Sequence, residues 1–266
     1  PGYRPPQAAA AGGQLSLFGE PVTQISQSET FDNHFTVVDT PEALRELQQV
    51  LSKAQGLAVD TETTGIDPLR AELVGISLSV AEGQGYYIPV GHRTGEPQLP
   101  LETVRAALLP AFTDSKLPKY GHNAKYDLLA LRQAGLDLAP ITFDTMIAGF
   151  LIDPGSRALG LKDMAEDYLS LTMTHIEELI GKGKNQISMD AVPVGRAAAY
   201  AAADAEVTLR LVAPLRAKMA ERGVETLFET VEMPLVPVLA MMEQNGIALD
   251  LDFLKQMSVE LTARLG

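Results

Sequence analysis

The stretch GLAVDTETTGIDPLRAELVGISLSVAEGQGYYIPV, residues 56–90, decides the fold of this chain. Its short apolar runs predict three strands near 56–61, 73–80 and 86–90, each bounded by polar or turn-forming residues. The last two strands are joined by EGQG at 82–85, which is typical of a hairpin connection. Three neighbouring strands of this kind predict a mixed sheet with an antiparallel part.

Helix patterns lie on both sides of these strands. Before them, Thr40 precedes Pro41 and Glu42, an order typical of a helix N-cap and first turn. Asp144 is placed in the same way to cap a helix that runs to residue 151. Further helices are expected near 101–112, 124–134, 159–169 and 194–222. Strands and helices in this order predict an α/β fold in which helices flank the sheet.

The composition excludes several classes of function. The 266 residues contain no cysteine, which excludes disulfides, thiol catalysis and cysteine-containing metal sites. The four histidines are widely scattered, which argues against a multi-histidine metal cage. The net charge of −13 argues against double-stranded DNA binding through a basic face, but it is compatible with a site that reaches phosphate through bound cations.

The pattern along the chain also predicts its organisation. No uncharged apolar run approaches the ~18 residues of a membrane helix, and the chain begins without a signal segment, so we expect no membrane partner and a cytoplasmic location. Residues 1–30 lack a sustained period and predict a flexible linker. The main domain is expected over 31–222, and the change of pattern after it predicts that 223–266 begin a second domain.

Two carboxylates follow the apolar part of the strand near 56–61. Side chains two residues apart point to the same face of a strand, so Asp60 and Glu62 are expected to project together. Carboxylates this close repel each other unless one is protonated or a cation lies between them. The pair alone is also compatible with a solvated strand end. The apolar residues before it indicate a central strand, where a charged end usually serves a site.

Two helices carry further candidates. Asn123 is placed to cap the helix near 124–134, and Asp127 lies one turn further on, where an acid also suits the positive end of a helix. On the helix near 194–222, Tyr200 and Asp204 are four residues apart and share one face. An aspartate among so many alanines either faces solvent or, if buried, needs a cation or a strong donor.

These segments together supply four carboxylates and a tyrosine. Oxygen ligands without cysteine or clustered histidine favour hard divalent cations, Mg²⁺ or Mn²⁺. Carboxylates from separate elements can hold two metal ions ~3.5–4 Å apart, and such a pair of ions suits in-line displacement of a leaving group at a phosphorus atom. The residues that would carry this chemistry are Asp60, Glu62, Asp127, Asp204 and Tyr200.

The same segments resemble a known family. DTET at 60–63, NxxxD at 123–127 and YxxxD at 200–204 are similar, in order, to the three motifs of the 3′–5′ exonucleases with four acidic residues and a tyrosine. Longer stretches resemble bacterial DNA polymerases of family A, the polymerase I type, over about residues 33–266; they lie at 72–77, 143–146, 181–186 and 232–239. The resemblance implies a ribonuclease-H-like fold, followed from about residue 223 by the first helices of a polymerase domain.

The resemblance also implies a role for each acidic residue. Asp60, Glu62 and Asp204 would hold a first metal ion, which activates water. Asp60 and Asp127 would hold a second, which stabilises the leaving oxygen. Tyr200 would orient the attacking water. The implied cofactors are two divalent metal ions, Mg²⁺ with Mn²⁺ able to substitute.

A second set of side chains is expected to bind the substrate. Asn123 would lie near the terminal nucleotide, and two isoleucines would pack against the terminal bases. Arg157, together with Lys162, would steer the single strand, although solvated surface positions remain the alternative for both. The residues assigned to substrate binding are Thr61, Thr63, Ile66, Asn123, Arg157 and Ile176.

The function that the resemblance implies is proofreading in DNA replication and repair. The chain would hydrolyse the last phosphodiester bond at a single-stranded or frayed DNA 3′ end and release nucleoside 5′-monophosphates. Its partners would be that 3′ end and the polymerase and 5′-nuclease domains of the same polypeptide, and we expect a monomer. The polymerase active site itself is not in this chain. The alternatives are a catalytically silent module that braces the polymerase and an RNA 3′-end exonuclease of the same chemistry.

Overall fold

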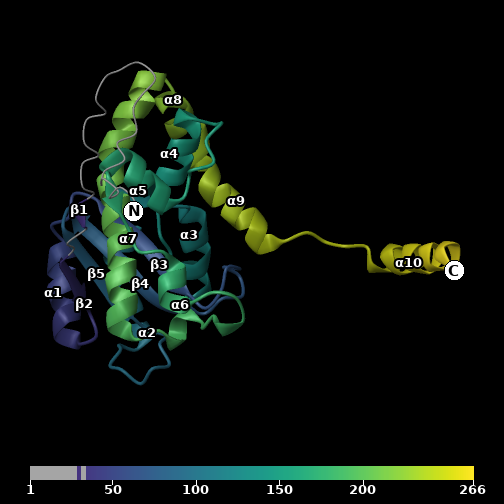
Figure 1. The fold of residues 1–266 in the computed structure, drawn as a ribbon, viewed down its shortest axis with the longest axis horizontal. Coiled ribbons are helices and arrows are strands. Elements are labelled where there is room, and N and C mark those ends of the chain that lie inside the picture. Colours follow the sequence, from purple (N-terminus) through teal and green to yellow (C-terminus); the bar gives the residue numbers. More distant parts are fainter. Residues whose placement is uncertain (1–28, 31–33) are drawn as a thin grey trace, which may run out of the picture.

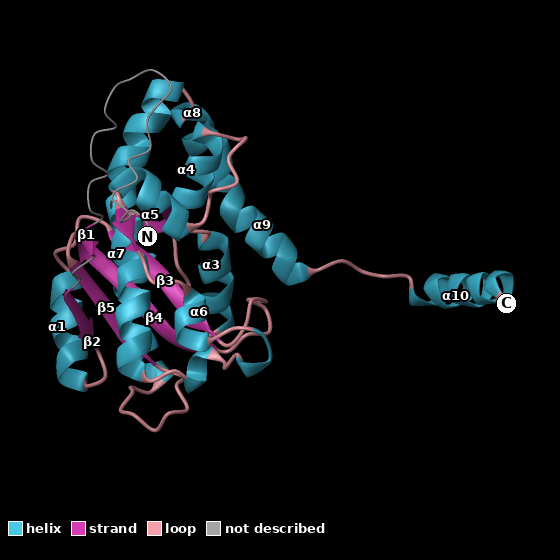
Figure 2. Ribbon diagram, viewed as in Figure 1, coloured by secondary structure: helices cyan, strands magenta, loops and turns pink. Residues whose placement is uncertain are grey.

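A six-stranded mixed sheet forms the centre of the computed structural model, which describes residues 29–30 and 34–266 (Figures 1 and 2). The strand order is β2-β5-β4-β3-β6-β7. Strand β4 is antiparallel to both of its neighbours, and the other pairs are parallel. The bounds are β2 (His34–Val37), β3 (Leu57–Thr63), β4 (Leu73–Ala81), β5 (Gln84–Pro89), β6 (Lys119–Gly121) and β7 (Ile141–Asp144).

The three strands predicted from residues 56–90 are confirmed as β3, β4 and β5, and they form the antiparallel part of the sheet. Strand β6 has only three residues. Strand β7 was not predicted, because its four residues are too few for an alternating pattern to show. A separate two-stranded pair joins β1 (Glu29–Thr30) to β8 (Leu171–Thr172). The rest of the predicted linker, residues 1–28, lies outside the described residues.

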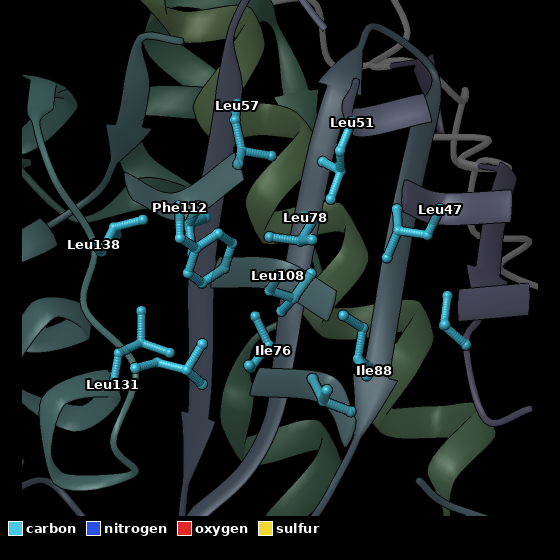
Figure 3. Close-up of a cluster of buried hydrophobic side chains, with 14 of the residues drawn as sticks. Leu47, Leu51, Leu57, Ile76, Leu78, Ile88, Leu108, Phe112, Leu131 and Leu138 are labelled. Atoms are coloured by element: carbon cyan, nitrogen blue, oxygen red, sulfur yellow. The ribbon is translucent and has the colours of Figure 1, made fainter. Parts of the chain in front are cut away.

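One face of the sheet packs against a layer of helices through a large apolar core (Figure 3). Helix α1 (Pro41–Leu51) begins as predicted, with the Thr40 side chain accepting a hydrogen bond from the backbone N–H of Ala43 at 3.2 Å. Helix α2 (Leu101–Thr113) and helix α3 (Ala124–Gln133) complete this layer. The core includes Leu47, Leu51, Leu57, Ile76, Leu78, Ile88, Leu108, Phe112, Leu131 and Leu138.

Helix α7 (Val194–Arg222) covers the opposite face, with the bounds that the sequence predicted. Its sheet-facing residues include Ala198, Ala201 and Ala202, which are fully buried. The fit is close: a Cβ atom added to Gly85 of β5 would lie 2.7 Å from the Cβ of Ala202. Small residues on both sides therefore let α7 approach the sheet closely, and this approach brings the polar residues of α7 to β3.

Shorter helices connect these layers and follow α7. Their bounds are α4 (Thr145–Ile152), α5 (Leu161–Leu169), α6 (Ile176–Ile180), the 3-10 turns η1 (Gly183–Asn185) and η2 (Met189–Ala191), α8 (Glu225–Leu227), the π-helical segment η3 (Phe228–Glu232), α9 (Met233–Asn245) and α10 (Leu251–Leu265). A second apolar core, separate from the one in Figure 3, buries Phe228 and Val236 with Phe143. Helix α10 has no buried side chain and extends away from the rest (Figure 1). Within the described residues, no helix has the length and apolarity to cross a membrane. The predicted domain boundary after residue 222 coincides with the end of α7 and stays a prediction.

Candidate active site

Strand β3 presents two carboxylates on the face that α7 covers. Asp60 and Glu62 alternate with Thr61, so they point to the same side, as predicted. The hydroxyl of Ser77 on β4 donates a hydrogen bond to Asp60 Oδ2 at 3.0 Å. Glu62 is only 7% exposed, and the register of the β3–β4 pair shifts directly after it. The central position of β3 thus gives one buried carboxylate, Glu62, and one partly buried carboxylate, Asp60, which accepts a hydrogen bond from Ser77.

The third carboxylate comes from the first turn of α3. Asp127 is 3% exposed, and its Oδ1 accepts two hydrogen bonds from Thr61, from the backbone N–H at 3.0 Å and from the hydroxyl at 2.7 Å. Thr61 was assigned to substrate binding, but its hydroxyl is engaged inside the protein. The structure therefore gives Thr61 a role in holding α3 against β3.

Asn123 occupies the N-cap position of α3, but its side chain makes no capping hydrogen bond, so this part of the prediction is wrong. Its backbone is left-handed, with φ of 59°, and its side chain is exposed. The carboxylate of Asp144 takes over the capping, because it accepts from the N–H groups of Asn123 at 3.2 Å and Ala124 at 2.7 Å. Asp144 also accepts from Met146 and Ile147 and so caps α4, as predicted. One buried carboxylate thereby sets the start of two helices.

The fourth carboxylate and the tyrosine come from α7. Asp204 is 8% exposed and Tyr200 is partly buried, so the solvent-facing alternative for Asp204 does not apply. The ammonium of Lys162 on α5 contacts Asp204 Oδ1 and lies 4.4 Å from the centre of the Tyr200 ring. Lys162 was expected to steer DNA, but the structure pairs its ammonium with Asp204.

The electrostatics of this cluster are unfavourable without a further cation. Burial, and then the neighbouring carboxylates, raise the pKa of Asp60 well above its usual range. Burial is also the main cause that raises the pKa of Glu62 to about 8, that of Asp127 to about 7, and that of Asp204 above its ordinary value. Lys162 lowers the pKa of Glu62 and Asp204 and so offsets part of this shift. Three buried carboxylates and one partly buried carboxylate thus face a single ammonium, and an added cation would stabilise their charged forms.

The donor chemistry therefore fits a hard divalent cation. Within the described part of the chain, no three histidine, aspartate or glutamate residues are arranged to hold one metal ion. Asp127 accepts hydrogen bonds from Thr61, and the ammonium of Lys162 pairs with one of the four carboxylates, that of Asp204.

The remaining substrate candidates lie around this cluster. Ile66 is 96% exposed in the loop after β3, and Ile176 at the start of α6 packs against the same apolar cluster as Tyr200. Thr63 donates a hydrogen bond to the carbonyl of Gly65 at 2.8 Å. Arg157 is exposed in the loop between α4 and α5. Their assignment to DNA binding stays a prediction.

Sequence reasoning missed several residues that the structure brings to the site. Ser77 was not singled out because it lies among the apolar residues of its strand. The signal would have been that the strand pairing sets this serine opposite Asp60. Tyr126 donates a hydrogen bond to the Gly65 carbonyl at 2.6 Å and so ties the loop that carries Ile66 to α3. The Nδ1 atom of His122 is 2.9 Å from the hydroxyl oxygen of Thr145. Burial, and then Lys162, lower the pKa of His122 to about 4, so this histidine is neutral.

Comparison with known proteins identifies the family of this chain. A family model described as 3′–5′ exonuclease matches residues 35–220. DNA polymerase I from Chloroflexus aurantiacus is 43% identical over 256 residues, which cover 95% of this chain and 26% of that protein. The chain spans about a quarter of the length of the first curated relatives that it matches.

Solved structures show the same architecture. The POL domain of Pol1 from M. smegmatis, in complex with DNA primer-template and dNTP, matches with a TM-score of 0.68 at 25% identity and covers 86% of this chain and 35% of that chain. NrnC from Brucella melitensis with bound Mg²⁺ matches with a TM-score of 0.60 at 21% identity and covers 81% of this chain and 95% of that chain, a likeness of fold alone. The expected ribonuclease-H-like α/β fold is confirmed. With a family match over most of its length and DNA polymerase I among its curated relatives, the chain belongs to the 3′–5′ exonuclease family.

Proposed function

We propose that this chain removes nucleotides one at a time from a single-stranded or frayed DNA 3′ end, as the proofreading domain of a DNA polymerase I. The observation that carries the proposal is the convergence of buried carboxylates from β3, α3 and α7 beside Tyr200. The exonuclease family supports the direction of the reaction, and the DNA polymerase I relatives favour DNA over RNA.

Two divalent metal ions fit this proposal. Asp60, Glu62 and Asp204 would hold one ion, and Asp60 and Asp127 would hold the other. When bound, such ions supply an activated water and stabilise the leaving oxygen. The raised pKa values of the carboxylates support this assignment, because burial disfavours their charged forms and a bound cation would stabilise those forms. The NrnC structure, which has the same fold, contains Mg²⁺.

The residues of the chain would orient the reacting groups. Burial, and then the charges of Asp204 and Glu62, raise the pKa of Tyr200 far above its ordinary value, so the phenol stays protonated and can donate a hydrogen bond to the attacking water. In the hydrolysis, the water oxygen forms a bond to phosphorus. The bond from phosphorus to the 3′ oxygen of the preceding nucleotide breaks, and that oxygen takes up a proton.

The DNA strand would approach over the exposed residues near the carboxylates. Ile66 and Ile176 would pack against the terminal bases, and Asn123 would lie near the terminal nucleotide. Arg157 would contact the strand further along. Tyr126 supports a role for the Ile66 loop, because its contact with Gly65 holds that loop beside the helix of Asp127.

We also propose how the chain is divided. Residues 31–222 would form the exonuclease domain, 1–30 a linker towards a 5′-nuclease domain, and 223–266 the start of a polymerase domain. This division is supported by the relatives, because the chain covers only about a quarter of the length of the first DNA polymerase I relatives that it matches. The exonuclease would act as a monomer at the 3′ end that the polymerase domain presents.

Digestion of a 5′-labelled single-stranded DNA oligonucleotide with Mg²⁺ tests the proposal. We expect a ladder that shortens from the 3′ end and disappears with a chelator or in Asp127→Ala. Asp137→Asn is the matched control, because Asp137 is a half-exposed aspartate that pairs with Arg132 away from the cluster, at 3.1 Å. This variant should digest DNA at the wild-type rate.

Each other outcome contradicts a defined part of the proposal. Full activity in Asp127→Ala would reject the metal assignment. Faster digestion of an RNA oligonucleotide of the same sequence would make the chain an RNA 3′-end exonuclease. No ladder with Mg²⁺ or Mn²⁺ at high protein concentration would favour a silent module that braces the polymerase.

A further inference from the structure

A buried tyrosine–histidine pair lies behind the carboxylates of β3. The hydroxyl of Tyr87 on β5 is 2.7 Å from Nε2 of His92, and Nδ1 of His92 is 3.0 Å from the backbone carbonyl of Val192. A carbonyl only accepts, so Nδ1 carries the proton of the neutral ring, and the Tyr87 hydroxyl donates to Nε2. Tyr87 is fully buried and His92 nearly so. The proposed reaction uses neither residue.

One end of this pair lies beside Glu62. Tyr87 is paired with Ser77, and Ser77 is paired with Asp60, so all three point to the face that α7 covers. Glu62 is paired with Gly75, and a Cβ atom on Gly75 would lie only 2.2 Å from the Tyr87 hydroxyl oxygen. The hydroxyl therefore occupies the space that a side chain opposite Glu62 would fill. The charges of Glu62 and Asp60 add to burial in raising the pKa of Tyr87.

The other end holds the segment that leads into α7. Val192 lies two residues before the start of this helix, which carries Tyr200 and Asp204. Two neighbours of His92 hold the same segment. Arg93 pairs through Nε with Asp190 Oδ2 at 2.8 Å, and Glu96 accepts from the backbone N–H of Val194 at 2.8 Å.

We propose that His92 is a positioning residue that fixes the spacing between Glu62 on β3 and the active residues of α7, through Tyr87 on one side and Val192 on the other. The inference rests on the proposed function. Its physical basis is that a metal-dependent site loses activity when its ligands shift by a fraction of an ångström. A single imidazole that bonds both to the sheet and to the entry of α7 keeps these two ligand-bearing elements in register.

Two substitutions separate the two bonds. His92→Gln places an acceptor near the position of Nε2 and keeps the bond to Tyr87, whereas His92→Asn places a donor near Nδ1 and keeps the bond to Val192. Tyr87→Phe removes the same bond as His92→Asn. If one chain of contacts is responsible, Tyr87→Phe adds little to His92→Asn when the two are combined.

The measurements are kcat, KM for single-stranded DNA, the Mg²⁺ concentration for half-maximal rate, and Mn²⁺ binding by calorimetry. We expect His92→Ala to lower kcat by about 10- to 100-fold and to weaken Mn²⁺ binding several-fold, with KM for DNA unchanged. The single-bond variants should fall between this variant and the wild type. If His92→Ala does not fold, the three shape-preserving variants provide the test.

Leu108→Ala is the matched control, because Leu108 is equally buried but lies in the core on the opposite face of the sheet. This variant should lose thermal stability without a change in kcat below its unfolding temperature. His92 variants that behave like Leu108→Ala, with normal kcat and normal Mn²⁺ binding, would overturn the inference. An inactive wild type would overturn the proposed function instead, and Mn²⁺ binding by the variants would still decide the role of His92.

Discussion

The two faces of the sheet differ in composition and in their proposed contributions to stability and catalysis. On the side of α1 and α2, Leu57 and Val59 of β3 pack against Leu108 and other large apolar side chains (Figure 3). On the side of α7, the same strand presents Asp60 and Glu62. Alternation along one strand is enough to separate these faces, because successive side chains point in opposite directions.

The difference shows how stability and chemistry are divided in this fold. Burial of large apolar side chains on the first face stabilises the domain. The second face uses alanine, serine and glycine, which bring α7 close to β3 and β5 at the expense of buried apolar area. The carboxylates collected there repel one another, and this cost is tolerated because the opposite face supplies the stability.

The sharpest test of this division is the removal of one charge from the α7 face. We expect Asp60→Asn to lower kcat by about 10³-fold, or ~4 kcal/mol, because both proposed metal ions share this carboxylate. The free energy of unfolding without metal should not fall, since one repelling charge is lost. Activity assays and urea unfolding would check both. If Asp60→Asn unfolds more easily but keeps its kcat, the α7 face contributes to stability rather than to catalysis, and the proposed division is wrong.

The matching change on the apolar face is Leu108→Ala. Truncation of a fully buried leucine leaves a cavity and is expected to lower the free energy of unfolding by about 2–5 kcal/mol. The rate per folded molecule should stay at the wild-type value. Urea unfolding gives the first quantity, and assays well below the unfolding transition give the second. A large loss of kcat in the folded variant would contradict the separation of the faces.

The sequence alone predicted the parts of this arrangement that depend on local pattern. The strands within 56–90, the bounds of α7 and the shared face of Asp60 and Glu62 all follow from periods of two or 3.6 residues and from helix caps. The sheet order and the convergence of α3 and α7 on β3 do not follow from such patterns. For those, the resemblance of three motifs to a known family was needed.

The roles that the sequence did not predict arise from contacts between distant segments. Asp144 caps α3 from the end of β7, Thr61 of β3 binds Asp127 of α3, and Lys162 of α5 contacts Asp204 of α7. In each case the local signal pointed elsewhere, as Asn123 did towards a side-chain cap. A residue's local role can be predicted from its neighbours in sequence, but its partner across the fold requires the tertiary structure.

The pH dependence of stability should reflect the α7 face, because burial raises the pKa of Asp60, Glu62 and Asp204 there. Glu62 has an ordinary pKa of 4.5 and about 8 in the folded chain, so between these values the folded state binds more protons than the unfolded state. The metal-free protein should therefore lose stability as pH rises from 4.5 to 8, by up to about 5 kcal/mol for a pKa shift of this size. Thermal unfolding across this range would measure the loss. Glu62→Gln should flatten the profile, and saturating Mg²⁺ should reduce its slope; an unchanged slope in Glu62→Gln would show that the pH dependence does not arise from Glu62.

The smallest change expected on the α7 face is Ser77→Ala. It removes the hydrogen bond that the serine donates to Asp60 Oδ2 at 3.0 Å, and such a bond contributes about 1 kcal/mol. Because Ser77 positions Asp60 without taking part in the proposed reaction, kcat should fall by less than about tenfold. The Mg²⁺ concentration for half-maximal rate should rise, since the bond favours the charged form of Asp60. Ser79→Ala on the same strand is the control, because the Ser79 hydroxyl donates to the Ala81 and Gln84 carbonyls away from the carboxylates. Equal Mg²⁺ dependence in the two variants would show that Asp60 is held by the strand alone.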